Sequence, residues 1–225
     1  MDYHTLGKSI HAILEYFHQS LLDGSKEAHN RLMSLAFKKV QQEYKDKLTP
    51  EMTREVYDMI AQYLTFKKHL IANVLSVEKN FALNIGTEER PIVLNGMIDR
   101  VQLDEDGVLH VVDYKSSKSD RYLKNDLFQL LVYAYILLTE NPELEKVRGS
   151  YMMLRHDFRL ITKEFAKEEI LTIKDKILKY AEDITNETEY PANPTVLCGW
   201  CPFLELCVEG QAKVNRKIKH GEVQY

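Results

Sequence analysis

Two short apolar stretches joined by an Asp-Gly turn constrain the fold of this chain most. The first is Gly96-Met97-Ile98-Asp99-Arg100, and the second is Val111-Val112-Asp113-Tyr114-Lys115. Between them lies Asp106-Gly107, and such a pair between apolar runs is the strongest short-range signal for a β-hairpin. We therefore expect two antiparallel strands within a hairpin over residues 91–115.

The turn also predicts how the two strands pair. With Gly107 in the left-handed conformation at the end of a three-residue loop, Asp104 pairs with Val108, and counting back places Asp99 opposite Asp113. Cross-strand partners have Cβ atoms about 4.5–5.5 Å apart, and like charges at that distance repel. Side chains two residues apart share a strand face, so Lys115 joins Asp113. The hairpin thus predicts two carboxylates and one ammonium at one place.

This arrangement is either a metal-dependent catalytic site or a set of charged side chains that face solvent. Hard divalent cations such as Mg²⁺ take oxygen ligands, often one or two carboxylates completed by water and phosphate. A metal polarises a phosphoryl oxygen and lowers the pKa of a bound water, and a nearby lysine holds that water or neutralises charge in the transition state. On spacing alone, acids that merely face solvent have equal weight, because Asp and Lys are common on exposed strand faces.

A family resemblance separates the two readings. An Asp followed by Asp-x-Lys on the next strand resembles the core of the PD-(D/E)XK nuclease superfamily. Gly-Met-Ile-Asp-Arg-Val and Val-Val-Asp-Tyr-Lys-Ser are similar to its RecB/AddB-type exonuclease branch, over residues 6–207. The proline that names the superfamily is absent before Asp99, as is usual in this branch. The resemblance implies an α/β fold, namely a restriction-endonuclease-like mixed central sheet flanked by helices, with a helical N-terminal region.

The same resemblance implies further site residues. Leu6-Gly7-Lys8-Ser9-Ile10-His11 matches a Leu-Gly-x-x-x-His motif whose histidine helps to bind the metal. Gln129-Leu130-Leu131-Val132-Tyr133 matches a Gln-x-x-x-Tyr motif, in which the amide holds the DNA backbone or orients the lysine and the hydroxyl fixes water. The plain alternatives are a partly buried helix histidine and two residues at the edge of the core. The implied metal ligands are His11, Asp99, Asp113 and the backbone carbonyl of Tyr114; the implied catalytic residues are Asp99, Asp113, Lys115, Gln129 and Tyr133.

The remaining pattern predicts the other elements. Helices are expected over residues 6–22, 25–47 and 50–75, the third with Thr49 as N-cap and Pro50 at its first position. A strand follows over residues 77–85. Its only acid, Glu78, is either an extra metal or water ligand or, the favoured reading, an exposed strand glutamate.

After the hairpin, Asp120 is expected to cap a helix that ends at about residue 140. A second hairpin over residues 146–154 and 158–165 and a helix over residues 167–186 complete the pattern. We expect one nuclease domain over residues 1–225, with a helical part at about 6–75, a catalytic core at about 76–165, and a C-terminal helix and Cys-rich loop at about 166–225.

Composition limits the setting. The chain has 225 residues, of which 44% are hydrophobic and 28% charged, as in ordinary soluble globular domains. No apolar run approaches the roughly 18 residues that span a bilayer, and the N-terminus lacks signal-peptide features. A cytoplasmic protein with no membrane partner is expected. The net charge is −4, so contact with DNA has to come from local basic patches.

Three cysteines lie close together near the C-terminus. Cys198, Cys201 and Cys207 form a C-x2-C-x5-C pattern, and thiolates this close converge readily on zinc or an iron–sulfur cluster. The pattern is similar to the C-terminal triplet of AddB-type nucleases and CRISPR-associated adaptation exonucleases. In those relatives a fourth cysteine upstream of the first helix completes a [4Fe–4S] cluster. No fourth cysteine is present here, so either the start is truncated or misassigned, another ligand such as His4 replaces it, or the cluster is lost.

Together these features predict a Mg²⁺- or Mn²⁺-dependent DNA exonuclease. We expect it to act in DNA recombination or repair or in phage DNA processing, with a helicase or recombination partner. The alternatives are a structure-specific endonuclease and a metal-stapled DNA-binding subunit whose nuclease site is idle. The intact Asp99, Asp113 and Lys115 argue against the idle site.

Overall fold

The computed structural model describes residues 3–70, 72–117, 119, 123 and 126–219. The chain forms two compact units, Met1–Lys179 and Tyr180–Tyr225, and the division falls within helix α7 (Ile173–Asn186). Each unit is described by itself. The single domain expected over residues 1–225 stays a prediction, because a compact unit need not fold independently.

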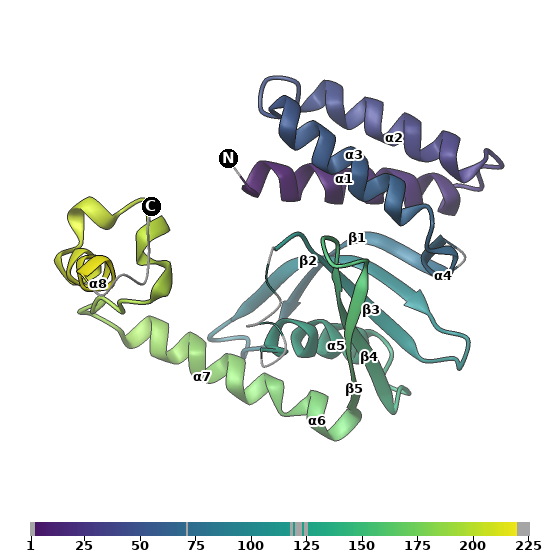
Figure 1. The fold of residues 1–225 in the computed structure, drawn as a ribbon. Coiled ribbons are helices and arrows are strands. Elements are labelled where there is room, and N and C mark those ends of the chain that lie inside the picture. Colours follow the sequence, from purple (N-terminus) through teal and green to yellow (C-terminus); the bar gives the residue numbers. More distant parts are fainter. Residues whose placement is uncertain (1–2, 71, 118, 120–122, 124–125, 220–225) are drawn as a thin grey trace. The chain divides into compact units, whose positions relative to one another are not determined.

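Three helices form the N-terminal layer of the first unit: α1 (Tyr3–Leu22), α2 (His29–Glu43) and α3 (Pro50–Tyr63). Helix α1 buries apolar residues at helical spacing, from Leu6 to Phe17, toward the other helices and the sheet. Thr49 caps α3 as expected, because its Oγ1 accepts a hydrogen bond of 3.3 Å from the Met52 backbone N–H. Figure 1 shows these helices together on one side of the sheet.

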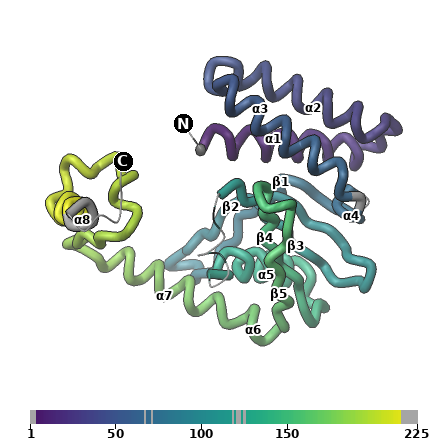
Figure 2. The backbone as a smooth tube through the Cα atoms, viewed as in Figure 1, coloured from purple at the N-terminus to yellow at the C-terminus, as the bar shows by residue number. Residues whose placement is uncertain are grey.

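A five-stranded sheet follows: β1 (Asn73–Asn84), β2 (Val93–Leu103), β3 (Leu109–Lys115), β4 (Lys146–Met153) and β5 (Arg159–Ala166). The strands lie in sequence order. Strands β3 and β4 pair in parallel, and every other neighbouring pair is antiparallel. Helix α5 (Phe128–Glu140) lies in the crossover that the parallel pair requires, and it can be found beside β4 in Figure 2.

The sheet is covered on both faces. Val112, Tyr114 and Met152 belong to the core with α1–α3, whereas Val111 and Tyr151 belong to the core with α5. This alternation follows from the two-residue period of a strand. Helix α6 (Lys167–Leu171) completes the second core through its buried Ile170. The predicted α/β class, a mixed sheet flanked by helices with a helical N-terminal region, is confirmed.

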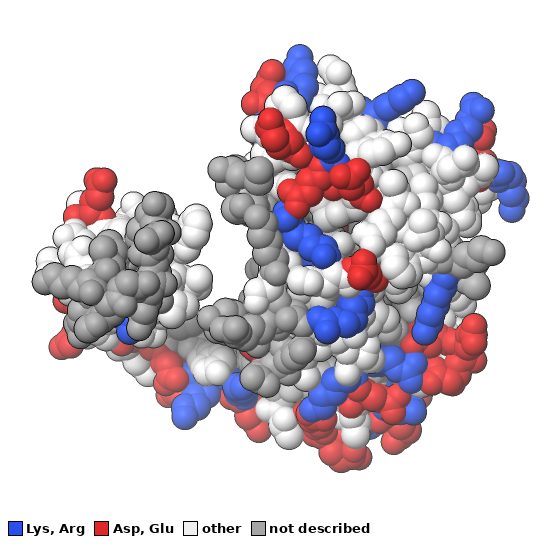
Figure 3. All heavy atoms as spheres, in the orientation of Figure 1, with Lys and Arg blue, Asp and Glu red and all other residues white. Residues whose placement is uncertain are grey.

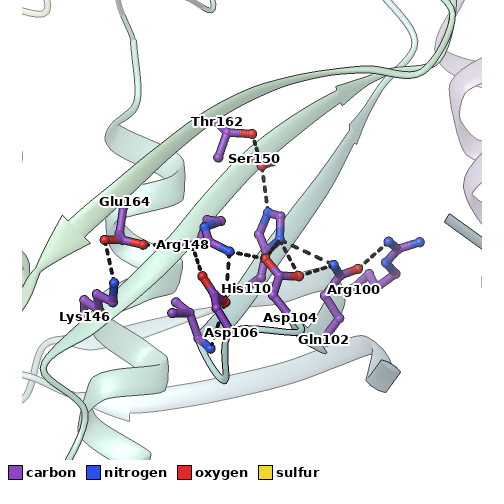
Figure 4. A network of polar contacts seen from close by, with 11 residues as sticks. Arg100, Gln102, Asp104, Asp106, His110, Lys146, Arg148, Ser150, Thr162 and Glu164 are labelled. Atoms are coloured by element: carbon purple, nitrogen blue, oxygen red, sulfur yellow. Dashed lines mark hydrogen bonds and ion pairs between the residues drawn. The ribbon is translucent and has the colours of Figure 1, made fainter. Parts of the chain in front are cut away.

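A polar network fastens the β2–β3 turn to the neighbouring strands (Figure 4). Arg148 on β4 donates hydrogen bonds to Asp104 and Asp106 at the turn and to Glu164 on β5. His110 Nδ1 lies 3.0 Å from Asp104 Oδ2, and its Nε2 lies 2.7 Å from the hydroxyl of the buried Ser150. The network therefore holds the hairpin in register against β4.

Several predicted helices differ from the observed ones. The third ends at Tyr63 and is followed by the short α4 (Lys67–Leu70), and residues 73–75, predicted as helix, belong to β1. Pairing of Asn73 with Leu103 explains this, since tertiary context overrides weak local preferences. The helix predicted over residues 167–186 breaks into α6 and α7 at Thr172. Helix α5 begins at Phe128, and the predicted cap Asp120 lies outside the described residues.

The second unit contains the end of α7, two short 3-10 helices, η1 (Val196–Trp200) and η2 (Leu204–Leu206), and α8 (Val208–Lys219). Several large apolar side chains are exposed here, among them Trp200 and Leu206. In neither unit does the described part of the chain contain a helix long and apolar enough to cross a bilayer. The cytoplasmic location stays a prediction.

Candidate active site

The central hairpin has the predicted register. Arg100 pairs with Val112, and the Asp104 N–H donates a hydrogen bond of 3.0 Å to the Val108 carbonyl. Gly107 has a φ of 78°, the left-handed conformation that the turn was expected to need. The same count carried one step further places Asp99 opposite Asp113.

Beyond Arg100 and Val112, a side-chain hydrogen bond replaces the backbone pairing of β2 and β3. Asp99 Oδ2 accepts a hydrogen bond of 2.7 Å from the backbone N–H of Tyr114. A carboxylate of β2 thus takes the place of a backbone acceptor of β2. The β2–β3 pairs end at Arg100 and Val112, so Asp99 and Tyr114 lie just past the end of the ladder.

Helix α1 brings His11 to this point. Its Nε2 lies 2.9 Å from the carbonyl oxygen of Tyr114, and its Nδ1 lies 3.4 Å from Asp99 Oδ1. A close approach makes this possible, because a Cβ at Gly7 would lie only 2.9 Å from Ser116 Oγ in the loop after β3. Neighbouring ligands of an octahedral Mg²⁺ ion are about 3 Å apart, so His11 and the Tyr114 carbonyl have the spacing of two adjacent ligands.

Lys115 is held from two sides. Its Nζ lies 2.7 Å from Asp113 Oδ2 and donates a hydrogen bond of 2.8 Å to Gln129 Oε1. Gln129 Nε2 in turn donates a hydrogen bond of 2.7 Å to the hydroxyl of Tyr133, one turn later on α5. The structure therefore brings every expected catalytic residue and the expected metal ligands to one region of the first unit.

Two nearby residues were missed or misjudged. Tyr151 was not predicted; its ring centroid lies 5.0 Å from the Lys115 ammonium, and it stands opposite Asp113 on the parallel strand β4. No local signal in the sequence reveals the register of a parallel pair. Glu78 was expected to be exposed, and this is wrong because it is half-buried beside the site. One ligand atom each from His11, Glu78 and Asp99 lie within 4.8 Å of one another.

The carboxylates of the site are buried and repel one another, so their charged forms are unfavourable without a bound cation. Burial and, secondarily, the charge of Asp99 raise the pKa of Asp113 to about 6, even though Lys115 acts in the opposite direction. Burial and Asp99 likewise raise the pKa of Glu78 to about 7. For His11, burial lowers the pKa, but the contact with Asp99 and the neighbouring carboxylates outweigh it, and the pKa is raised. Crowded carboxylates with raised pKa values are typical of a site that receives a cation.

The donors present fit a divalent cation. Asp113 is buried, and its Oδ2 pairs with the Lys115 ammonium at 2.7 Å. Carboxylate oxygens, a backbone carbonyl and one imidazole suit a hard or borderline divalent ion. His11, Asp99, Asp113 and the Tyr114 carbonyl are therefore the groups that could hold it.

The three cysteines lie in the second unit. Cys198 Sγ accepts a hydrogen bond from the backbone N–H of Thr195, and Cys207 Sγ accepts one from Gly210, both at 3.2 Å. Cys201 is exposed. In the described part of the chain the three thiols do not converge into a ready metal-binding group.

Comparison with known proteins places the chain in a family. The profile of the PD-(D/E)XK nuclease superfamily matches residues 1–208. The chain belongs to this superfamily. Over 79 residues, the nuclease also resembles one subunit of the ATP-dependent helicase/deoxyribonuclease of Streptococcus pyogenes. The identity is 38% in serotype M49 (strain NZ131) and 39% in serotype M6 (strain ATCC BAA-946 / MGAS10394) over the same 79 residues.

These matches have a limited extent. They cover 34% of this chain and 7% of the length of each relative. Their names agree with the resemblance to the RecB/AddB branch. The crystal structure of SSO0001 aligns with 92% of this chain and 96% of its own, at 20% identity and a TM-score of 0.43.

Proposed function

We propose that this nuclease is a divalent-metal-dependent DNA exonuclease. The observation that carries the proposal is the convergence of Asp99, Asp113 and Lys115, in which the Lys115 ammonium lies 2.7 Å from the buried Asp113 Oδ2. The choice of DNA is supported by the deoxyribonuclease named among the relatives. The exonuclease mode rests on the resemblance to the RecB/AddB branch.

The proposed roles follow from position. Asp99, Asp113, His11 and the Tyr114 carbonyl would hold a Mg²⁺ or Mn²⁺ ion. Such an ion polarises a phosphoryl oxygen and lowers the pKa of water, so that hydroxide is available near neutral pH.

Lys115 would orient the attacking water and offset the negative charge that develops on the phosphoryl group. Gln129 accepts from the Lys115 ammonium and so fixes its direction, and Tyr133 fixes Gln129. These two residues therefore support the lysine.

Binding of DNA would depend on local groups. The net charge is −4, and the side chains drawn in colour over the first unit in Figure 3 mix acidic and basic groups on that face. A whole-molecule field does not attract a polyanion here, so affinity should come from contacts near the site. We propose action in recombination, repair or phage DNA processing, with a helicase partner suggested by the relatives' name.

A cleavage assay tests the proposal. Linear DNA labelled at either end and closed circular DNA are incubated with Mg²⁺ or Mn²⁺, and Asp113→Asn serves as the control. The proposal expects metal-dependent release of label from linear DNA, no cutting of circles and no activity of the variant. Cutting of closed circles would establish an endonuclease, and binding without cleavage would establish an idle site; each outcome contradicts the proposal.

We further propose that Cys198, Cys201 and Cys207 hold a structural centre of zinc or iron–sulfur type. Backbone N–H donors to two of the sulfurs support this, because such hydrogen bonds stabilise thiolate charge. With three cysteines in the chain, a [4Fe–4S] cluster needs a fourth ligand, so we propose that the centre is labile.

A further inference from the structure

We infer that Met97 is a substrate-binding residue of this nuclease, and that its thioether side chain contacts the base of the nucleotide that adjoins the scissile phosphate. The inference rests on the proposed function, because it concerns how the same site seats its DNA strand. It is drawn from the β1–β2 ribbon, by which we mean residues 79–84 of β1 and residues 93–98 of β2.

The β1–β2 ribbon starts at the candidate active site and continues beyond it. Pairing of β2 with β3 stops at Arg100, whereas pairing of β2 with β1 continues to Val93. Met97 lies two residues from Asp99 on the same strand, so their Cα atoms are about 7 Å apart. A nucleotide whose phosphate lies at the metal site can therefore place its base on Met97.

One face of the ribbon is fixed against helix α5. Phe81 belongs to the core around α5, and its ring centroid lies 6.1 Å from that of Tyr133 in an edge-on contact. A Cβ at Gly96 would lie 2.7 Å from the Phe81 ring, so glycine lets this ring pack closely against β2. Tyr133 also holds Gln129, which directs Lys115. The same helix thus positions both the ribbon and the catalytic lysine.

The opposite face of the ribbon is open and carries no charge. Its side chains alternate with those that pack against α5, and all of them are exposed: Asn80, Ala82 and Asn84 on β1, and Val93, Asn95 and Met97 on β2. Met97 keeps 43% of its surface exposed and Val93 keeps 55%. The exposed residues of β5, by contrast, include Arg159 and Glu164.

A nucleotide base is the occupant that this face fits. The exposed row offers no Lys or Arg to a phosphate, so the part of a DNA strand that lies on it is the neutral part. Methionine sulfur makes favourable contacts with aromatic rings, and DNA-binding proteins insert methionine between base steps. Asn80 pairs with Met97 across the ribbon, and its amide can donate to and accept from the edge of the same base.

Cleavage of oligonucleotides that lack a single base tests the inference. Initial release of the terminal nucleotide gives kcat/KM for wild type, Met97→Ala and Leu75→Ala, on an intact strand and on strands in which each of the terminal nucleotides in turn is abasic. Leu75 is a matched control on β1 because it is apolar and 48% exposed, and its chain neighbours pair with Val101 and Gln102, on the far side of Asp99.

On the intact strand, Met97→Ala should lower kcat/KM by about five- to tenfold, the factor expected for a methionine–aromatic contact. Leu75→Ala should stay within about twofold of wild type, as exposed substitutions usually do. Loss of the contacted base should lower the wild-type value by a similar factor. The same loss should change the Met97→Ala value by less than about twofold, because the contact is already missing.

Three results would overturn the inference. The first is an unchanged kcat/KM in Met97→Ala. The second is a set of losses that multiply independently at every abasic position, since a direct contact requires coupling at one of them. The third is an equal loss in Leu75→Ala, which would reveal a general effect of the ribbon surface.

Two further variants check the chemistry of the contact. Met97→Leu keeps an apolar side chain of similar volume and should retain most of the wild-type kcat/KM and its dependence on the base. Met97→Gln has a similar length but a polar end, and should behave as Met97→Ala does. A Met97→Gln protein with wild-type coupling to the base would contradict an apolar contact.

Failure of the proposed function gives a different result. If wild type cleaves none of these strands with Mg²⁺ or Mn²⁺, the proposed function is wrong, and the inference that rests on it is wrong as well. If wild type and Met97→Ala cleave the intact strand equally fast, the proposed function stands and Met97 does not contact the substrate.

Discussion

At Asp113, the folded protein holds a charge in an unfavourable place. Its pKa is raised to about 6, so the folded state binds more protons than the unfolded state between about pH 4 and pH 6, and the free energy of unfolding falls as the pH rises through that window. In chelator at pH 8, Asp113→Asn should therefore be more stable than wild type by about 0.5–2 kcal/mol, while its cleavage activity is lost.

Asp106 provides the matched control in denaturant titrations. It is exposed, and its hydrogen bond from Arg148 lowers its pKa, so Asp106→Asn should lose stability at pH 8 instead of gaining it. If both variants shift the free energy of unfolding in the same direction, the charged form of Asp113 does not destabilise the folded state.

Lys115 should matter for turnover more than for affinity. Its ammonium is directed by Asp113 and Gln129, and interactions made mainly in the transition state raise kcat. Lys115→Ala should lower kcat by about 10²–10⁴-fold, the range for a positioned proton-transfer group, with little change in DNA affinity measured in chelator. A variant that loses affinity but keeps kcat at saturating DNA would show that the lysine is only a phosphate contact.

At the scale of elements, the approach of α1 to the loop after β3 sets the position of His11. An added Cβ at Gly7 would meet Ser116 Oγ at 2.9 Å, so α1 and the loop have to move apart slightly, which costs little folding free energy but shifts His11. Gly7→Ala should therefore change the free energy of unfolding by less than about 1 kcal/mol. It should lower kcat/KM by about tenfold, because small displacements of catalytic groups are costly.

The double variant Gly7→Ala with Ser116→Gly checks the cause. Removing the hydroxymethyl group frees the space, so kcat/KM should recover at least partly. No recovery would mean that α1 is positioned by other contacts.

The polar network around the β2–β3 turn should make the first unit sensitive to acid. Burial lowers the pKa of His110 more than Asp104 raises it, and the pKa of His18 is likewise lowered by burial and by Arg100. The unfolded state therefore binds more protons below about pH 6.5, and stability falls as the pH falls.

Asp104 adds to this loss at lower pH. Its burial raises the pKa, but hydrogen bonds from Gln102 and Arg148 outweigh that effect, so its stabilising contribution disappears as the pH falls below about 4. Arg148→Met should lower the unfolding free energy by about 1–3 kcal/mol at pH 7 and flatten its decline below pH 4. An unchanged acid profile would exclude this network as its source.

Features fixed by residues close together in the sequence could be predicted, and features fixed by long-range pairing could not. The turn at Gly107 and the strand period sufficed to predict the register in which Arg100 pairs with Val112, because both are short-range constraints. The helix predicted through residue 75 failed because pairing of β1 with β2 decided that segment. Tyr151 and the position of Glu78 depend on a parallel register and a left-handed backbone, neither of which has a signal within a few residues.

For the whole molecule, the cysteine-rich second unit offers a separate test. Protein purified without oxygen should carry iron or zinc below stoichiometry, lose it in air, and lose it entirely in Cys201→Ser. Metal analysis and visible absorption measure this directly. A stoichiometric, air-stable [4Fe–4S] cluster on this chain would contradict the proposed lability and require a fourth ligand.

The parallel contact between β3 and β4 also has a consequence for folding order. The antiparallel pairs β1–β2, β2–β3 and β4–β5 join neighbours in sequence, whereas β3 and β4 are separated by about thirty residues that include α5. Contacts that close long loops form late, because their entropy must be overcome first. Lys115 lies on one side of this contact and Tyr151 on the other, with Gln129 between them in the chain. We therefore expect the carboxylate hairpin to form early and the lysine to acquire its neighbours only when the two halves of the sheet join, so that nuclease activity is recovered with the slowest phase of refolding.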